Sequence, residues 1–166
     1  MEFESRLPQQ MYMVTTTYNK INSIRLSETI FSIHENLKNS LIKKYFILLE
    51  VELPTDSIIQ YDAYIKKETA LDFTNIIKDE FLKLLEHEKI EIYLIKNRPT
   101  YKYIFDFCNT YSNIIWILSN SDIHFPQWNE NKLKRLYNVD YDKEAFVLTR
   151  YNILSELSDE IRMNQK

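Results

Sequence analysis

Two residues of this sequence have types and spacing suited to metal and phosphate chemistry. They are Asn120 and Asp122, within the run Ser119-Asn120-Ser121-Asp122-Ile123. Carboxylate and amide oxygens are hard ligands that suit Mg²⁺ or Mn²⁺, and such a cation can neutralise a diphosphate. The alternative is that Asn, Ser and Asp only form a turn here, because they are among the commonest turn residues. Position alone leaves both interpretations open.

Other residues could assist at the same place. Arg98 and Arg150 each follow a segment that reads as a strand, and a guanidinium can pair with a phosphate through two parallel hydrogen bonds. A surface salt bridge explains Arg98 equally well. Thr16 and Tyr18 end the first such segment, where Tyr18 could stack on a base or, alternatively, pack in the core.

The elements that must position these residues alternate between two kinds. Short apolar runs predict strands over residues 11–17, 45–51, 90–95, 113–118 and 145–149. Apolar residues at helical spacing predict helices over 26–37, over 71–85, and from Pro99 or Thr100 to Cys108, with a short helix around 133–136. Strands that alternate with helices and are nearly continuous in apolar residues favour a parallel sheet.

The predicted fold is therefore α/β, a Rossmann-like and mostly parallel sheet with helices on both faces. Ligands of such sheets bind beyond the carboxyl ends of the strands, and this rule places Thr16, Arg98, Asp122 and Arg150 at one edge. We expect a single domain over 11–152, preceded by an extension over 1–10 and followed by a polar tail over 153–166.

Composition excludes several classes of function. The 166 residues contain no glycine, so a P-loop, a G-x-G-x-x-G loop and a G-x-S-x-G elbow are all impossible. The single cysteine, Cys108, excludes an internal disulfide and is expected in the core. A net charge of −3 with interspersed signs argues against nucleic acid as a partner. No apolar run is long enough to span a membrane and residues 1–10 lack a signal peptide, which favours the cytoplasm.

Four segments, in order along the chain, resemble segments of GT-A type glycosyltransferases, which are nucleotide-diphospho-sugar transferases. I-I-W-I-L-S-N-S-D-I-H-F at 114–125 is similar to their metal-binding segment, which reads S-N-x-D-I in one bacterial and viral group. M-V-T-T-T-Y at 13–18 resembles the opening strand that contacts the nucleotide base. I-K-N-R-P-T-Y at 95–101 looks like an R-P-T-Y turn ahead of a helix, and F-V-L-T-R-Y at 146–151 looks like an A-L-T-R-Y/W strand.

The resemblance implies a GT-A-like protein that binds a nucleoside-diphosphate sugar with Mn or Mg. Asp122 and Asn120 would hold the metal, although Asn120 stands where a strict D-x-D has its first Asp. Thr16, Tyr18, Arg98 and Arg150 would contact the nucleotide. An active member would transfer the sugar to an acceptor that the sequence does not identify, and its catalytic residues stay unassigned.

The resemblance covers a donor-binding half and no acceptor half. The alternative is therefore a shortened, non-catalytic relative that acts as a binding or structural component of an assembly, for instance a viral one inside a host cell. In that case we expect an oligomer or a complex with a partner chain.

Overall fold

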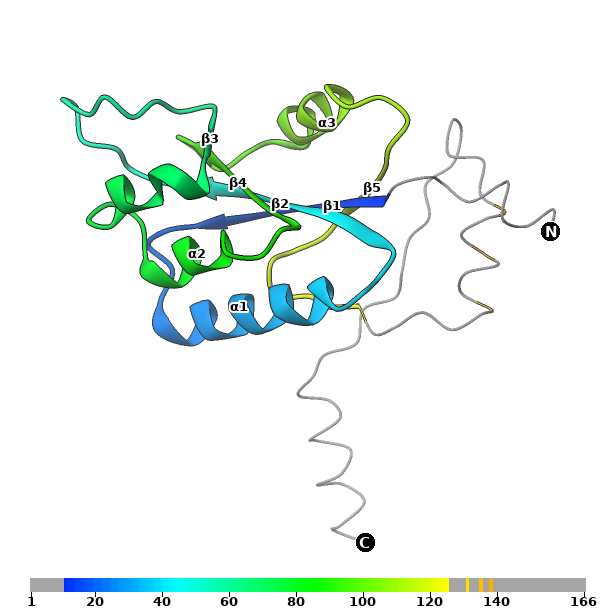
Figure 1. The fold of residues 1–166 in the computed structure, drawn as a ribbon. Helices are drawn as coiled ribbons and strands as arrows, with labels where there is room; N and C mark the ends of the chain where they lie inside the picture. The colour runs from blue at the N-terminus through cyan, green and yellow to red at the C-terminus, as the bar shows by residue number, and fades with distance from the viewer. Residues whose placement is uncertain (1–10, 126–130, 132–134, 136–137, 139–166) are drawn as a thin grey trace, which may run out of the picture.

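The computed structural model describes residues 11–125 together with Asn131, Arg135 and Asn138. The chain forms an α/β fold built on one five-stranded sheet (Figure 1). Its elements are β1 (Met11–Tyr18), α1 (Ser23–Leu37), β2 (Ile42–Glu50), β3 (Ala63–Ile65), the 3₁₀ helix η2 (Lys67–Phe73), α2 (Asp79–Leu84), β4 (Ile90–Ile95), α3 (Tyr101–Asn109) and β5 (Ile115–Leu118). The alternation of strands and helices predicted from the sequence is confirmed.

The sheet is mostly parallel, with the strand order β3-β4-β2-β1-β5. β1 pairs in parallel with both β2 and β5, and β2 pairs in parallel with β4. Only the short edge strand β3 runs antiparallel to its neighbour. α1 and α2 lie below the sheet and α3 lies above it (Figure 1), so the helices cover both faces as predicted.

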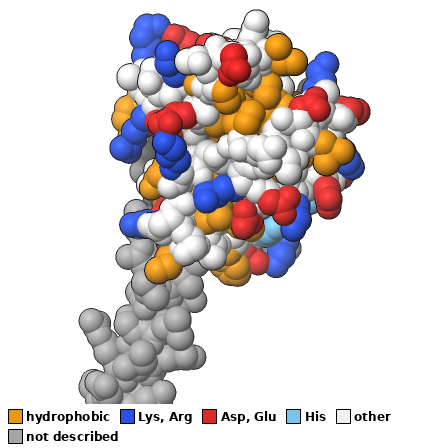
Figure 2. Space-filling model, turned by 90° about the vertical axis from the view of Figure 1, so that its left-hand side faces the viewer, with side chains coloured by type: hydrophobic (Ala, Val, Ile, Leu, Met, Phe, Trp, Pro, Cys, Tyr) orange, Lys and Arg blue, Asp and Glu red, His pale blue; other side chains and the backbone are white. Residues whose placement is uncertain are grey.

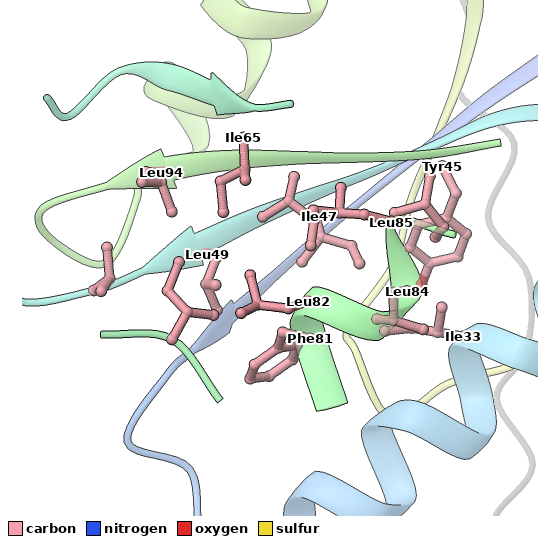
Figure 3. Close-up of a cluster of buried hydrophobic side chains, with 14 of the residues drawn as sticks. Ile33, Tyr45, Ile47, Leu49, Ile65, Phe81, Leu82, Leu84, Leu85 and Leu94 are labelled. Carbon is pink, nitrogen blue, oxygen red and sulfur yellow. The ribbon is translucent and has the colours of Figure 1, made fainter. Parts of the chain in front are cut away.

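The lower face of the sheet holds the larger core. Side chains of β2 point down between α1 and α2, where Tyr45, Ile47 and Leu49 meet Ile33 of α1 and Phe81 of α2 (Figure 3). All five are almost fully buried. The upper core under α3 is smaller and rich in aromatic rings, with Phe46, Phe107 and Trp116 in mutual contact. Alternate residues of one strand thus serve two different cores.

One helix prediction is wrong. The periodicity over residues 71–85 predicted a single amphipathic helix, but the structure has η2, then an irregular stretch, then α2. The amide oxygen of Asn19, which follows β1, accepts a hydrogen bond from the Lys78 backbone N–H at 2.9 Å. Its amide nitrogen donates to the Ile76 carbonyl at 2.8 Å. In a continuous helix both backbone groups would form hydrogen bonds within the helix. The contact with Asn19 therefore prevents one helix from running through this stretch.

The remaining differences are small. β2 begins at Ile42, earlier than the predicted 45, and the three-residue strand β3 was not predicted at all. α3 begins one residue after its cap Thr100, whose side chain accepts a hydrogen bond from the Tyr103 N–H. The strand predicted over 145–149 lies outside the described residues, and so does most of the helix predicted around 133–136.

Candidate functional site

The strand order creates one topological switch point in the sheet. From β1 the chain passes through α1 to β2 on one side, whereas from β4 it passes through α3 to β5 on the other side of β1. The carboxyl ends of β1 and β5 therefore lie side by side, and the chain segments that follow the two strands are not connected to each other at this edge. In open α/β sheets this is the usual place for a ligand crevice.

β1 extends beyond its neighbour at this point. β5 ends at Leu118, which pairs with Val14, and the Ser119 N–H donates to the Val14 carbonyl at 3.2 Å. Successive residues of a parallel strand direct their backbone groups to alternate neighbours. The N–H and C=O of Thr16 thus point toward the β5 side, where no described strand pairs with them. Tyr18, at the end of β1, has 47% of its side chain exposed.

The segment after β5 turns under the sheet and lies along α1, as the yellow trace shows (Figure 1). Asp122 forms an ion pair with Arg25 in the first turn of α1, with 3.5 Å between the carboxylate and the guanidinium. The Ser121 and Thr29 hydroxyls are 3.4 Å apart. The His124 ring packs edge-on against Phe31, 5.5 Å between centroids.

Asn36 anchors the far end of this segment. Its amide nitrogen donates to the Ile123 carbonyl at 2.9 Å, and its amide oxygen accepts from the Phe125 N–H at 2.8 Å. Asn36 itself is fully buried. Both polar groups of one buried amide are therefore used to hold the backbone that follows Asp122.

The Asp122 carboxylate is accessible to solvent. Its side chain is 27% exposed, and its partner Arg25 is 60% exposed. Arg25 also lies 4.0 Å from the carboxylate of Glu28, so one guanidinium stands near two carboxylates. The Asn120 side chain, two residues before Asp122, is exposed as well.

Arg98 occupies a different position from Asp122. It is exposed in the loop between β4 and α3, and no ion pair joins it to another residue of the described chain. β4 and β5 are separated by β2 and β1, roughly 14 Å at the usual strand spacing. Arg150, the other predicted phosphate contact, lies outside the described residues.

Buried polar groups line the lower face behind the segment after β5. Thr15, Tyr45 and Asn36 come together there, and burial raises the pKa of Tyr45 far above its ordinary value despite the nearby polar groups of Asn36 and Thr15. The hydroxyls of Thr15, Thr17 and Tyr45 have no hydrogen-bond partner of ordinary geometry. The lower core is mostly apolar, but next to the switch point it contains these buried polar side chains.

Other candidate chemistry receives little support. Within residues 11–125 and the three described residues beyond them, no group of three or more His, Cys, Asp and Glu side chains could hold a metal ion. Cys108 is buried as expected, and burial raises the pKa of its thiol to about 12. No helix in the described part of the chain is long and apolar enough to cross a membrane.

The face toward which β1 and β2 point carries mixed charges. Figure 2 shows acidic and basic side chains interspersed on this side, without a large area of one sign. A hollow of about 460 Å³ lies at the β3 edge of the sheet, opposite to β5. It is lined by Ile58, Ile59, Gln60, Ala63, Tyr64, Thr69, Asp72, Phe73 and Leu94, and so includes none of the predicted site residues.

The polar side of α1, three residues of which contact the segment after β5, was not predicted from the sequence. Arg25, Thr29, Ser32 and Asn36 follow one another at spacings of four, three and four, which is one line along a helix. This polar stripe runs beside the apolar stripe of Leu26, Ile33 and Leu37 that predicted the helix. Polar residues at helical spacing beside an apolar stripe are the signal in the sequence that indicates it.

Comparison with protein families, with curated proteins and with solved structures found no match to this chain. The case for its function therefore depends on the residues at the switch point and on how they are held.

Proposed function

We propose that this chain is a glycosyltransferase-like protein that binds a nucleoside-diphosphate sugar together with Mn²⁺ or Mg²⁺. One observation carries the proposal. The Asn120–Asp122 segment leaves β5 at the switch point of a parallel sheet, and the accessible carboxylate of Asp122 lies beside the first turn of α1. This is where the fold class binds nucleotides, and the residues there are oxygen ligands.

The residues fit such a ligand in kind. Asp122 and Asn120 offer a carboxylate and an amide oxygen to a hard cation, and the cation would neutralise the diphosphate. The backbone N–H and C=O of Thr16 offer one donor and one acceptor to the edge of a base, and Tyr18 offers a ring for stacking. Arg98 has no ion-pair partner in the described structure and is available to a phosphate, the role proposed for Arg150 as well.

The test is a thermal-shift screen of nucleotide sugars with and without manganese, because a ligand of the native state raises apparent stability. In Asp122→Ala we expect the manganese-dependent shift to disappear. Stability itself should fall by less than about 1 kcal/mol, since the Arg25 pair is exposed to solvent. Asp106→Ala is the control, because Asp106 also forms a solvent-exposed ion pair, with Lys102 on α3.

The proposal has clear ways to fail. Absence of a shift with every nucleotide sugar would contradict it, and so would an equal shift in wild type and Asp122→Ala. A large loss of stability in Asp122→Ala would instead support the turn-forming role of this residue.

The second candidate is a non-catalytic component of an assembly. It is favoured by the Arg25 guanidinium, which already neutralises Asp122, and by the lack of a three-residue metal cluster in the described part of the chain. Light scattering would then show a stable oligomer or complex, without nucleotide affinity. Sugar-transfer activity would argue for the first candidate. Transfer needs a bound donor, and it also needs a base placed against an acceptor hydroxyl.

A further inference from the structure

The polar stripe of α1, made of Arg25, Thr29, Ser32 and Asn36, contacts the segment after β5 at three points of unequal strength. Two of them are weak. The Ser121 and Thr29 hydroxyls are 3.4 Å apart, at the long end for a hydrogen bond between hydroxyls. The Arg25–Asp122 pair is 3.5 Å long and open to solvent, where ion pairs contribute little.

The third contact, made by Asn36, is strong. Two hydrogen bonds of 2.9 and 2.8 Å join its amide to the backbone of Ile123 and Phe125. These residues are two apart, so the amide binds the segment as a neighbouring strand would. Because Asn36 is fully buried, breaking the contact would leave unsatisfied polar groups out of reach of water.

We propose that Asn36 is a positioning residue for the candidate site. Its amide fixes the backbone of residues 123–125 on α1, and this in turn sets where the Asp122 carboxylate stands beside the first turn of α1. The consequence for ligand binding rests on the proposed function, whereas the positioning itself does not.

Only an amide can make this contact. Aspartate at position 36 could still accept from the Phe125 N–H, but it would set a second acceptor against the Ile123 carbonyl and would bury a charge. Leucine has similar size and offers neither a donor nor an acceptor. Asn36→Asp therefore removes only the hydrogen bond to the Ile123 carbonyl, whereas Asn36→Leu removes both hydrogen bonds.

Asn19 supplies a matched control within the same chain. It uses the same pair of contacts, donating to the Ile76 carbonyl at 2.8 Å and accepting from the Lys78 N–H at 2.9 Å. It therefore holds the stretch before α2 in the way that Asn36 holds residues 123–125. Asn19→Leu removes equivalent hydrogen bonds that hold a different segment of the chain.

The experiment is residue-resolved amide hydrogen exchange. In wild type, the Phe125 N–H should be protected although it lies outside any helix or strand. We expect its protection to fall at least about tenfold in Asn36→Leu, and to be partly retained in Asn36→Asp. Asn19→Leu should lose protection at Lys78 and keep it at Phe125. If Asn36→Leu does not fold, the wild-type and Asn36→Asp measurements still decide the question.

Two outcomes would overturn the inference: a Phe125 amide that exchanges freely in wild type, or equal protection in wild type and both Asn36 variants. Manganese-dependent binding of nucleotide sugars is the second readout. It should weaken at least about tenfold in Asn36→Leu. If wild type binds no nucleotide, the proposed function fails, and the exchange result alone decides whether Asn36 positions the segment.

Discussion

The two faces of the sheet are built from different chemistry. The upper face, under α3, is packed with aromatic rings, where Phe46 contacts five other rings. The lower face, under α1 and α2, is mainly aliphatic but also buries the polar residues Thr15, Thr17, Thr29, Ser32 and Asn36. Buried polar groups cost free energy unless they are hydrogen-bonded, so packing alone does not account for them.

The difference separates two structural roles within one small fold, which are packing of the sheet and docking of the segment after β5. The aromatic face offers mainly contact area, although the indole N–H of Trp116 is buried there without a hydrogen-bond partner among the described residues. Three of these polar residues, Thr29, Ser32 and Asn36, lie on α1, the helix that receives the segment after β5. We infer that the sequence of the α1 face reflects the docking of this segment, and that the α3 face mainly stabilises the sheet.

The largest effect that tests this contrast is expected for Phe46→Ala. Phe46 is 2% exposed at the centre of the upper face, and truncation of such a ring costs about 3–5 kcal/mol. Urea unfolding should show this loss as a lower midpoint with an unchanged slope. Phe46→Leu, which keeps most of the volume, should cost clearly less. If both variants were nearly as stable as wild type, the upper face would not be the stabilising one.

A smaller effect of opposite sign is expected on the lower face. Thr15 is completely buried, and its hydroxyl has no hydrogen-bond partner of ordinary geometry. Thr15→Val keeps the shape and removes the unsatisfied hydroxyl, so the free energy of unfolding should stay the same or rise by about 1 kcal/mol. The same urea titration measures it. A loss of 1 kcal/mol or more would mean that the Thr15 hydroxyl is hydrogen-bonded, either to the neighbouring Tyr45 or through a buried water.

The fold could be predicted from the sequence where local pattern and tertiary contacts agree. β1 and β4 were found almost to the residue because their apolar runs are continuous or alternate cleanly. The 71–85 helix failed because Asn19, far away in the sequence, takes backbone groups that the helix needs. β3 is too short for any pattern, and pairing with β4 defines it.

The candidate site could be predicted only in part. The rule for carboxyl ends of parallel strands placed Asp122 just beyond the end of a strand, where it follows β5, and that rule needs only parallel strands and not their order. The partner of Asp122 could not be found in the same way, because Arg25 is 97 residues away and meets it only through the fold. The Asn36 contact was missed for the same reason, although its place on the polar stripe was visible in the sequence.

The smallest expected effect is that of replacing Arg25. This substitution tests whether the lower face binds a cation. The Arg25 guanidinium lies 3.5 Å from Asp122 and 4.0 Å from Glu28, so it occupies a place between two carboxylates where a metal ion would compete with it. Arg25→Met keeps the helix and removes the charge. Stability should change by less than about 1 kcal/mol, because the side chain is 60% exposed.

Manganese affinity should rise by about two- to fivefold in Arg25→Met, since Asp122 would no longer be neutralised by a protein cation. Titration calorimetry with manganese and a nucleotide sugar measures this change. Lys102→Met is the control, because it removes the solvent-exposed cationic partner of a carboxylate on α3. Weaker binding in Arg25→Met would show that the guanidinium contacts the diphosphate itself. Unchanged binding would mean that Asp122 does not hold the metal, and the contrast between the two faces would then concern folding alone.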